Sequence, residues 1–435
     1  MTVQPFRLSD TAFAALGAGR PSADTLGVLR RAERTRHLLL LRQALRRVSD
    51  TPEWYADPPD DPMTGLWAGA AVTRSPHVLT TAGDGLTLSV RLEDTDPVRA
   101  RLGLTPTPPL SGAEVEHWRD CLERAWAVLV RRHRPAAETM AAVLRVIVPV
   151  VPDPSAEGIS ATSAEAFGAV AMSSPAGPDA LAAGLLHETQ HSVLNATSLL
   201  FDLVEPGGPR GYSPWRDDPR PAFGVLHGAY AYLAVVRFRR AEPGRAAAFE
   251  FARWRSAVAR AAAGLLAGGE LTPAGVRFTT ALLAEVEPWL AEPVEPEVQR
   301  LADLANADHR VRWRLRNLTV TPEDTARLVT AWRAGAGPPR VTPVLTGTPG
   351  RELAGGPRLP LIRALLDGRD PGEGPDADWV RGTVLPAYPI GVWDGLALVS
   401  RRPAWRERPE VVRAVARAIP EAGTEAVAIW LSNRN

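Results

Sequence analysis

A short metal-binding pattern, His-Glu-Thr-Gln-His at residues 187–191, constrains this chain more than any other feature. Two histidines at positions i and i+4 lie on one face of a helix, so both imidazoles can bind one metal ion. Leucines and alanines flank the pattern, which predicts a buried helix. Buried histidines are costly unless a ligand or a hydrogen bond satisfies them. The pattern therefore favours a metal site held by His187 and His191, with two unliganded histidines on an ordinary helix as the alternative.

The composition allows a large hydrophobic core and gives no electrostatic indication of a nucleic-acid or membrane partner. The chain has 435 residues, 45% of them hydrophobic, and a formal net charge of +1. The basic residues are all arginines. Cys121 is the single cysteine, which excludes an intramolecular disulfide and a thiolate metal cluster. Because we find neither a signal-peptide pattern nor an apolar run of about 20 residues, we expect a cytoplasmic protein.

Hydrophobic periodicity predicts an α+β fold that is predominantly helical, with the metal site between two central helices beside a small sheet. We expect three regions. Residues 1–135 should form a mostly helical N-terminal region, and residues 136–320 should form the catalytic region. Residues 321–435 are expected to form a linker and a small C-terminal α/β region.

Strands are expected in the sequence before the motif helix and again in the C-terminal region. Residues 143–151 and 166–172 are rich in β-branched and small apolar residues and precede the motif helix, so a sheet edge should lie beside the site. Such an edge can hold an extended peptide as an added strand. In the C-terminal region, residues 390–399 and 426–431 are predicted to be strands.

A catalytic metal usually needs a third protein ligand. Leu194 and Thr197 stand where a metzincin requires glycine and histidine, and the apolar helix expected from residue 222 offers no glutamate of the gluzincin kind. His227 lies in the middle of that helix, 36 residues after His191. It is the candidate third ligand, with a core histidine bonded to a carbonyl group as the alternative.

The motif region resembles a known bacterial family. The run His-Glu-x-Gln-His, followed by Pro-Trp-Arg-Asp-Asp-Pro-Arg-Pro and Gly-Val-Leu-His-Gly-Ala-Tyr-Ala-Tyr-Leu, is similar to the HExxH-type peptide-modification proteins. These are encoded beside ribosomally made peptide natural products, often with radical-SAM enzymes, and are described as iron- and 2-oxoglutarate-dependent peptide β-hydroxylases. The resemblance is specific across about residues 160–240.

The resemblance implies Fe(II) and 2-oxoglutarate as cofactors, a precursor peptide as substrate and a radical-SAM enzyme as a partner. It implies a facial set of ligands, His187, His191 and His227, that leaves three positions open on the metal. The far carboxylate of 2-oxoglutarate needs a cationic anchor, for which Arg216 and Arg220 are the candidates. Pairing of these arginines with neighbouring aspartates is the alternative.

The role of Glu188 divides the functional hypotheses. In a zinc-dependent peptidase or amidase, this glutamate is the general base that activates a metal-bound water. In an oxygenase it would orient a ligand, bond a water or enter the coordination shell. A third hypothesis is a non-enzymatic peptide-binding subunit in which a metal is structural or absent.

Overall fold

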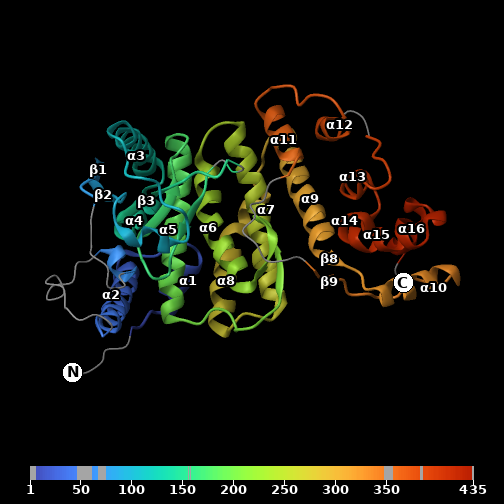
Figure 1. The fold of residues 1–435 in the computed structure, drawn as a ribbon, viewed down its shortest axis with the longest axis horizontal. Helices are drawn as coiled ribbons and strands as arrows, with labels where there is room; N and C mark the ends of the chain where they lie inside the picture. The colour runs from blue at the N-terminus through green and yellow to red at the C-terminus, as the bar shows by residue number, and fades with distance from the viewer. Residues whose placement is uncertain are drawn as a thin grey trace. The chain divides into compact units, whose positions relative to one another are not determined.

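The computed structural model describes residues 6–46, 61–66, 75–154, 156, 158–346, 356–382 and 386–433. The chain is predominantly helical with a small mixed sheet, as the periodicity predicts (Figure 1). It divides into two compact units that each collect several segments of the sequence. The first unit takes Met1–Gly207, Leu226–Ala241 and Val258–Trp289, and the second takes Gly208–Val225, Glu242–Ala257 and Leu290–Asn435. The units therefore interleave along the chain, which is a different division from the three consecutive regions expected.

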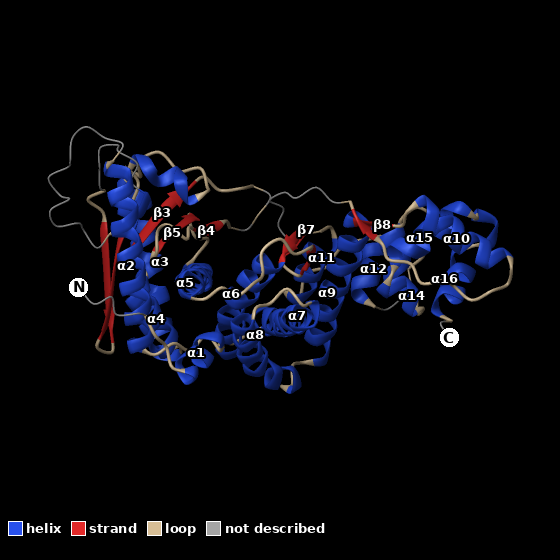
Figure 2. Cartoon of the chain, turned by 90° about the horizontal axis from the view of Figure 1, so that it is seen from below, coloured by secondary structure: helices blue, strands red, loops and turns tan. Residues whose placement is uncertain are grey.

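A five-stranded sheet forms the framework of the first unit (Figure 2). Its strands lie in the order β1-β2-β3-β5-β4, and β4 is the last strand on one side among the strands described. The pairs β2–β3 and β3–β5 are parallel, whereas β1–β2 and β4–β5 are antiparallel. The bounds are β1 Val78–Gly83, β2 Leu86–Leu92, β3 Val146–Val150, β4 Ser160–Thr162 and β5 Ala169–Ser173.

Apolar layers cover both faces of this sheet. Every residue of β3 and β5 is buried, which matches their continuous apolar sequence. Side chains alternate between faces along a strand, so Ile147 packs with Trp118 and Leu185 while Val146 and Val148 pack with Met63 on the other face. Both strands are thus buried, and β5 is the one that pairs with the edge strand β4.

Helices complete the first unit. The sequence prediction of the motif helix and of its apolar partner is confirmed, since α5 covers Pro178–Leu200 and α6 covers Ala222–Ala241. Proline at the start of α5 suits a helix N-terminus, because that position needs no backbone donor. The other helices of this unit are α1 Asp10–Gly17, α2 Ala23–Leu45, α3 Gly112–Arg132, α4 Arg134–Val143 and α8 Pro273–Val286, with the short 3-10 turns η2 Pro62–Leu66 and η3 Pro97–Leu102.

The second unit is built around the long helix α9, Pro296–Asn317. Its apolar face packs with residues such as Phe249, Trp405 and Val411. The hairpin of β6 (Arg210–Ser213) and β7 (Arg216–Pro221) contacts α9. The remaining elements are the start of α7 (Arg245–Gly268), β8 Leu318–Thr319, β9 Val344–Leu345, α10 Pro322–Arg333, α11 Arg358–Leu366, α12 Pro375–Arg381, α13 Trp393–Val399, α14 Pro403–Glu407, α15 Pro409–Ala418 and α16 Thr424–Ser432. The 3-10 turns are η4 Glu287–Ala291, whose residues are divided between the units after Trp289, and η5 Pro420–Ala422.

The C-terminal region differs from its prediction as an α/β piece. The stretches expected to be strands, 390–399 and 426–431, contain the helices α13 and α16. Each carries an apolar run too short to show a clear period, so a strand and a buried helix look alike in sequence. The expected linker contains α11 and α12, and residues 347–355 of it lie outside the described residues.

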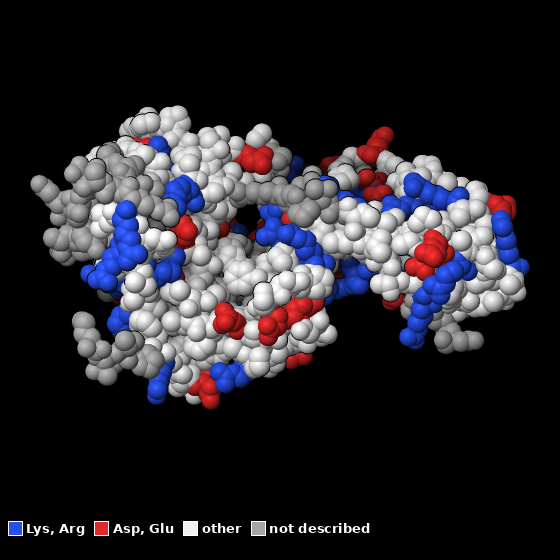
Figure 3. Space-filling view, turned by 60° about the horizontal axis from the view of Figure 1, so that its bottom comes forward, with Lys and Arg blue, Asp and Glu red and all other residues white. Residues whose placement is uncertain are grey.

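Among the described residues, we find no helix that combines the length and the apolar character needed to cross a membrane. On the face drawn in Figure 3, arginines and acidic residues are interspersed, in keeping with the formal net charge of +1.

Candidate metal centre

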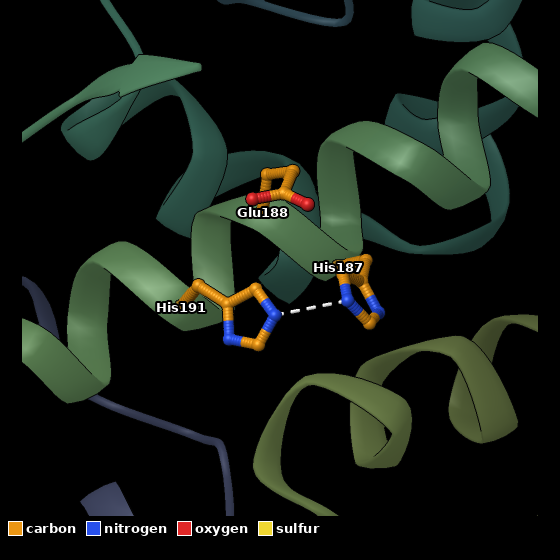
Figure 4. A group of neighbouring side chains, drawn as sticks. All are labelled: His187, Glu188 and His191. Carbon is orange, nitrogen blue, oxygen red and sulfur yellow. Dashed lines mark hydrogen bonds between the residues drawn. The ribbon is translucent and has the colours of Figure 1, made fainter. Parts of the chain in front are cut away.

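The motif lies in the middle of α5, a helix that contacts α3 and the edge strand β4. Figure 4 shows the imidazoles of His187 and His191 on one side of the helix and the Glu188 carboxylate on another. One ligand atom from each of these three residues lies within 4.8 Å of the other two. We call this set the motif group.

The two imidazoles face each other through the nitrogens that a metal would bind. His191 Nε2 lies 2.9 Å from His187 Nε2, and the rings are nearly perpendicular. Two ligands at about 2.1 Å from one ion lie about 3.0 Å apart when they subtend a right angle. The separation of the two nitrogens therefore suits adjacent positions on one cation.

Burial keeps both imidazoles in the neutral form, which is the form that binds metals. Burial, followed by the neighbouring His227, lowers the pKa of His187 to about 3. The same causes hold the pKa of His191 well below its usual value, with His187 contributing as well. Protons therefore compete weakly with a cation for these nitrogens at neutral pH.

Glu188 is 1% exposed and lies beside the edge strand β4. Ser160 on β4 donates a 2.6 Å hydrogen bond from Oγ to Glu188 Oε1. This bond fixes the carboxylate between the motif helix and the sheet edge. Nothing in the local sequence marks Ser160, because it lies 28 residues before Glu188 on a strand of three residues.

His227 lies next to the motif group, as the prediction of a third histidine requires, but its ring does not point at the same centre. It stacks on His191 with ring centroids 3.9 Å apart and planes 11° apart, and its Nε2 lies 3.1 Å from Asn195 Oδ1. A nitrogen lone pair lies in the plane of its own ring. Two stacked rings therefore cannot both direct a lone pair at one ion unless one of them turns. Ligation by His227 stays a prediction that requires such a rotation.

Two tyrosines of α6 have different roles, and of the two only Tyr232 is seen in contact with the motif group. The ring of Tyr232 meets that of His187 edge-on at 5.1 Å. Tyr230 is fully buried and donates a hydrogen bond to the carbonyl oxygen of Leu16, so its role is to fasten α1 to α6. Burial raises the pKa of Tyr230 well above its usual value, which keeps its proton on the phenol.

Arg216 and Arg220, the predicted anchors of 2-oxoglutarate, lie on β7 in the second unit. Arg216 Nε lies 2.7 Å from Asp218 Oδ1, and an Arg220 nitrogen lies 3.3 Å from Asp218 Oδ2. Asp218 is 3% exposed, so both guanidinium groups neutralise a buried carboxylate. This is the alternative pairing that the sequence left open, and anchoring by these arginines stays a prediction.

The turn of α5 that carries the motif contains buried polar side-chain atoms whose hydrogen-bonding capacity is not satisfied by the described residues. Thr189 Oγ1, Gln190 Oε1 and His191 Nδ1 have no hydrogen-bond partner among the residues that the structure describes. Buried polar atoms without partners are rare, and they point to an ion, a water or a functional role at the place where they cluster. The donor set of two neutral imidazoles and one carboxylate suits a divalent metal such as zinc or iron.

Comparison with known protein families and with curated proteins finds no match for this chain.

Proposed function

We propose that this chain is a metal-dependent oxygenase that uses Fe(II) and 2-oxoglutarate to hydroxylate a side-chain β-carbon of a ribosomally made peptide. The observation that carries the metal-binding part is the 2.9 Å approach of two neutral imidazole nitrogens from one helical turn. The oxygenase part is supported by the likeness of residues 160–240 to the HExxH-type peptide β-hydroxylases. A radical-SAM enzyme acting on the same peptide belongs to this proposal.

In this proposal, His187 and His191 hold Fe(II), and His227 becomes the third ligand once its ring turns away from Asn195. When bound, Fe(II) and 2-oxoglutarate supply the oxidising power, with O2 consumed and 2-oxoglutarate converted to succinate and CO2 as the peptide gains a hydroxyl group. Arg216 and Arg220 are proposed to bind the far carboxylate of 2-oxoglutarate. Glu188, held by Ser160, orients groups around the metal instead of acting as a base.

The edge strand supports a peptide as the substrate. β4 pairs with β5 on one side only among the strands described, and its Ser160 bonds to Glu188 of the motif group. An extended peptide that added to β4 would receive main-chain hydrogen bonds while its side chains alternated between the two faces. One side chain would then lie close to the metal.

A zinc peptidase is the second candidate, and one observation favours it. Glu188 belongs to the same 4.8 Å group as the two histidines, which is where a general base for a metal-bound water must be. This function predicts peptide cleavage with zinc alone and no need for O2.

Anaerobic titration of the metal-free protein separates the two candidates. With Fe(II) and 2-oxoglutarate, we expect a visible charge-transfer band, and admission of O2 should yield succinate. Both signals should be lost in His187→Ala and His191→Ala and kept in His77→Gln, a control histidine outside the motif group. Turnover with zinc alone, with no response to 2-oxoglutarate, would reject the oxygenase in favour of the peptidase.

A further inference from the structure

Asn195 continues the row of residues that carries the two motif histidines. Residues four apart in a helix lie one turn apart on the same face, so His187, His191 and Asn195 follow one another along α5. Figure 4 shows the side of α5 on which the two imidazoles lie. Asn195 is half-buried, and its Oδ1 lies 3.1 Å from Nε2 of His227 on α6, in the same unit. Asn195 thus contacts the predicted third ligand without belonging to the motif.

The contact with Asn195 engages the nitrogen that His227 would need for a metal. His187 and His191 face each other through Nε2, so Nε2 is the matching atom of His227. Whichever end of the Asn195 amide faces it, Nε2 uses its proton or its lone pair in this bond. One nitrogen cannot bond to Asn195 and to an ion at once. Ligation through Nε2 therefore requires the bond to Asn195 to break.

The stacking of His227 on His191 keeps the ring in the same resting position. The ring centroids are 3.9 Å apart and the planes 11° apart. A metal–nitrogen bond of about 2.1 Å lies in the plane of its imidazole, so an ion in the plane of His191 lies away from the plane of His227. His227 is thus beside the two ligands but does not share their ion in this position.

From these contacts we propose that Asn195 is a positioning residue that holds His227 away from the metal. The site at rest then presents two imidazoles, and the third joins only when the bond to Asn195 breaks. The inference rests on the metal site of the proposed function and on His227 as its third ligand. It does not depend on 2-oxoglutarate, on O2 or on which divalent metal binds.

A restraint of this kind lowers the apparent affinity for a metal. When only a fraction of the molecules has the binding-competent conformation, the apparent dissociation constant is divided by that fraction and therefore rises. A neutral hydrogen bond corresponds to a factor of about five in an equilibrium constant. Removing the amide of Asn195 should therefore tighten metal binding about fivefold, provided that His227 is present to become a ligand.

The test is competition titration of the metal-free full-length protein with zinc against a chromophoric chelator. Asn195→Leu keeps a side chain of similar size without the amide, and we expect it to bind zinc about fivefold more tightly than the wild type. In a His227→Ala background, Asn195→Leu should change nothing. Ser198→Ala is the matched control on the same helix, because Ser198 is half-buried and its Oγ has no hydrogen-bond partner among the described residues.

Circular dichroism checks that each variant is folded, and Asn195→Ala provides a second variant without the amide. The proposal is overturned if Asn195→Leu binds zinc no more tightly than the wild type, if the gain persists without His227, or if the wild type binds no zinc. Weaker binding in Asn195→Leu would also overturn it, since Asn195 would then hold His227 in a ligating position.

The result for Asn195 can be separated from that for the oxygenase. Zinc binding that tightens in Asn195→Leu, with no succinate formed from Fe(II) and 2-oxoglutarate, would reject the oxygenase and leave the role of Asn195 intact. Succinate formation with an unchanged zinc affinity in Asn195→Leu would do the reverse.

Discussion

Ser160 connects the edge of the sheet to the motif glutamate through one short hydrogen bond. Residues that orient the groups around a metal affect activity without holding the metal themselves. Ser160 is a positioning residue of this kind in our account. Its hydroxyl holds one oxygen of the Glu188 carboxylate toward β4.

Replacement Ser160→Ala should lower the rate of succinate formation about tenfold while the iron content stays that of the wild type. Ser160→Thr keeps the hydroxyl group and should restore most of the rate. Iron analysis and a turnover assay on the same samples measure the two effects. An alanine variant with wild-type turnover would show that the bond is only structural.

The pKa of His187 predicts how the metal-free protein responds to acid. Its folded-state pKa, about 3, lies below the ordinary value of 6.5, so the unfolded chain takes up the proton first as the pH falls. The contribution that neutral His187 makes to the free energy of unfolding is therefore complete above pH 6.5, and it decreases as the pH falls toward 3. One such group gives a slope of about 1.4 kcal/mol per pH unit.

Urea unfolding of the metal-free protein between pH 7 and pH 4 measures this slope. In His187→Gln, the dependence of the unfolding free energy on pH should be shallower than in the wild type by that amount. Identical slopes in the two proteins would contradict the lowered pKa.

The sequence predicted the placement of His187 and His191, because a spacing of four within one helix depends on local geometry alone. It also placed His227 on the neighbouring apolar helix. The direction of the His227 ring could not be predicted, since it follows from a contact with Asn195, 32 residues away in the chain. Ser160 was missed for the same reason.

At the scale of elements, α5 owes its position to its apolar face rather than to the motif. Leu185 is fully buried between the helix and the sheet, whereas Leu199 at the other end of α5 is 40% exposed. Leu185→Ala should lower the free energy of unfolding by about 3 kcal/mol, because it leaves a cavity. Leu199→Ala, the matched control, should change it by less than about 1 kcal/mol.

Chemical denaturation followed by circular dichroism measures both variants. Equal losses of unfolding free energy for Leu185→Ala and Leu199→Ala would contradict the packing of α5 described here.

The long periodic helices such as α3, α5 and α6 were predictable, since their patterns extend over several turns. The short C-terminal helices α13 and α16 were not, because about two turns carry too little of the pattern.

For the molecule as a whole, one buried arginine links several segments of the second unit. Arg358 is 2% exposed and bonds to three aspartates at 2.7–2.8 Å, namely Asp308, Asp376 and Asp394. Burial alone would lower the pKa of Arg358, but Asp308 and Asp394 outweigh it and raise the pKa above its usual value, so the group stays charged. Breaking a buried network by removing one partner leaves charges without compensation.

Arg358→Met should therefore destabilise the second unit by about 3–5 kcal/mol. Arg369→Met, which removes an arginine paired with Asp367 on the surface, should have little effect. Calorimetry should show a lower transition for the first variant, while its metal affinity stays that of the wild type, because the motif group lies in the first unit. If Arg358→Met lost metal binding as well as stability, the metal site in the first unit would not be independent of the second unit.

Metal content per chain, after reconstitution with Fe(II) and removal of excess metal, shows directly whether His187 and His191 hold an ion. We expect about one ion per chain for the wild type and for His77→Gln, and almost none for His187→Ala and His191→Ala, with all four proteins folded by circular dichroism. A wild-type chain that binds no ion, or a His191→Ala variant that retains it fully, would contradict metal binding by these two imidazoles.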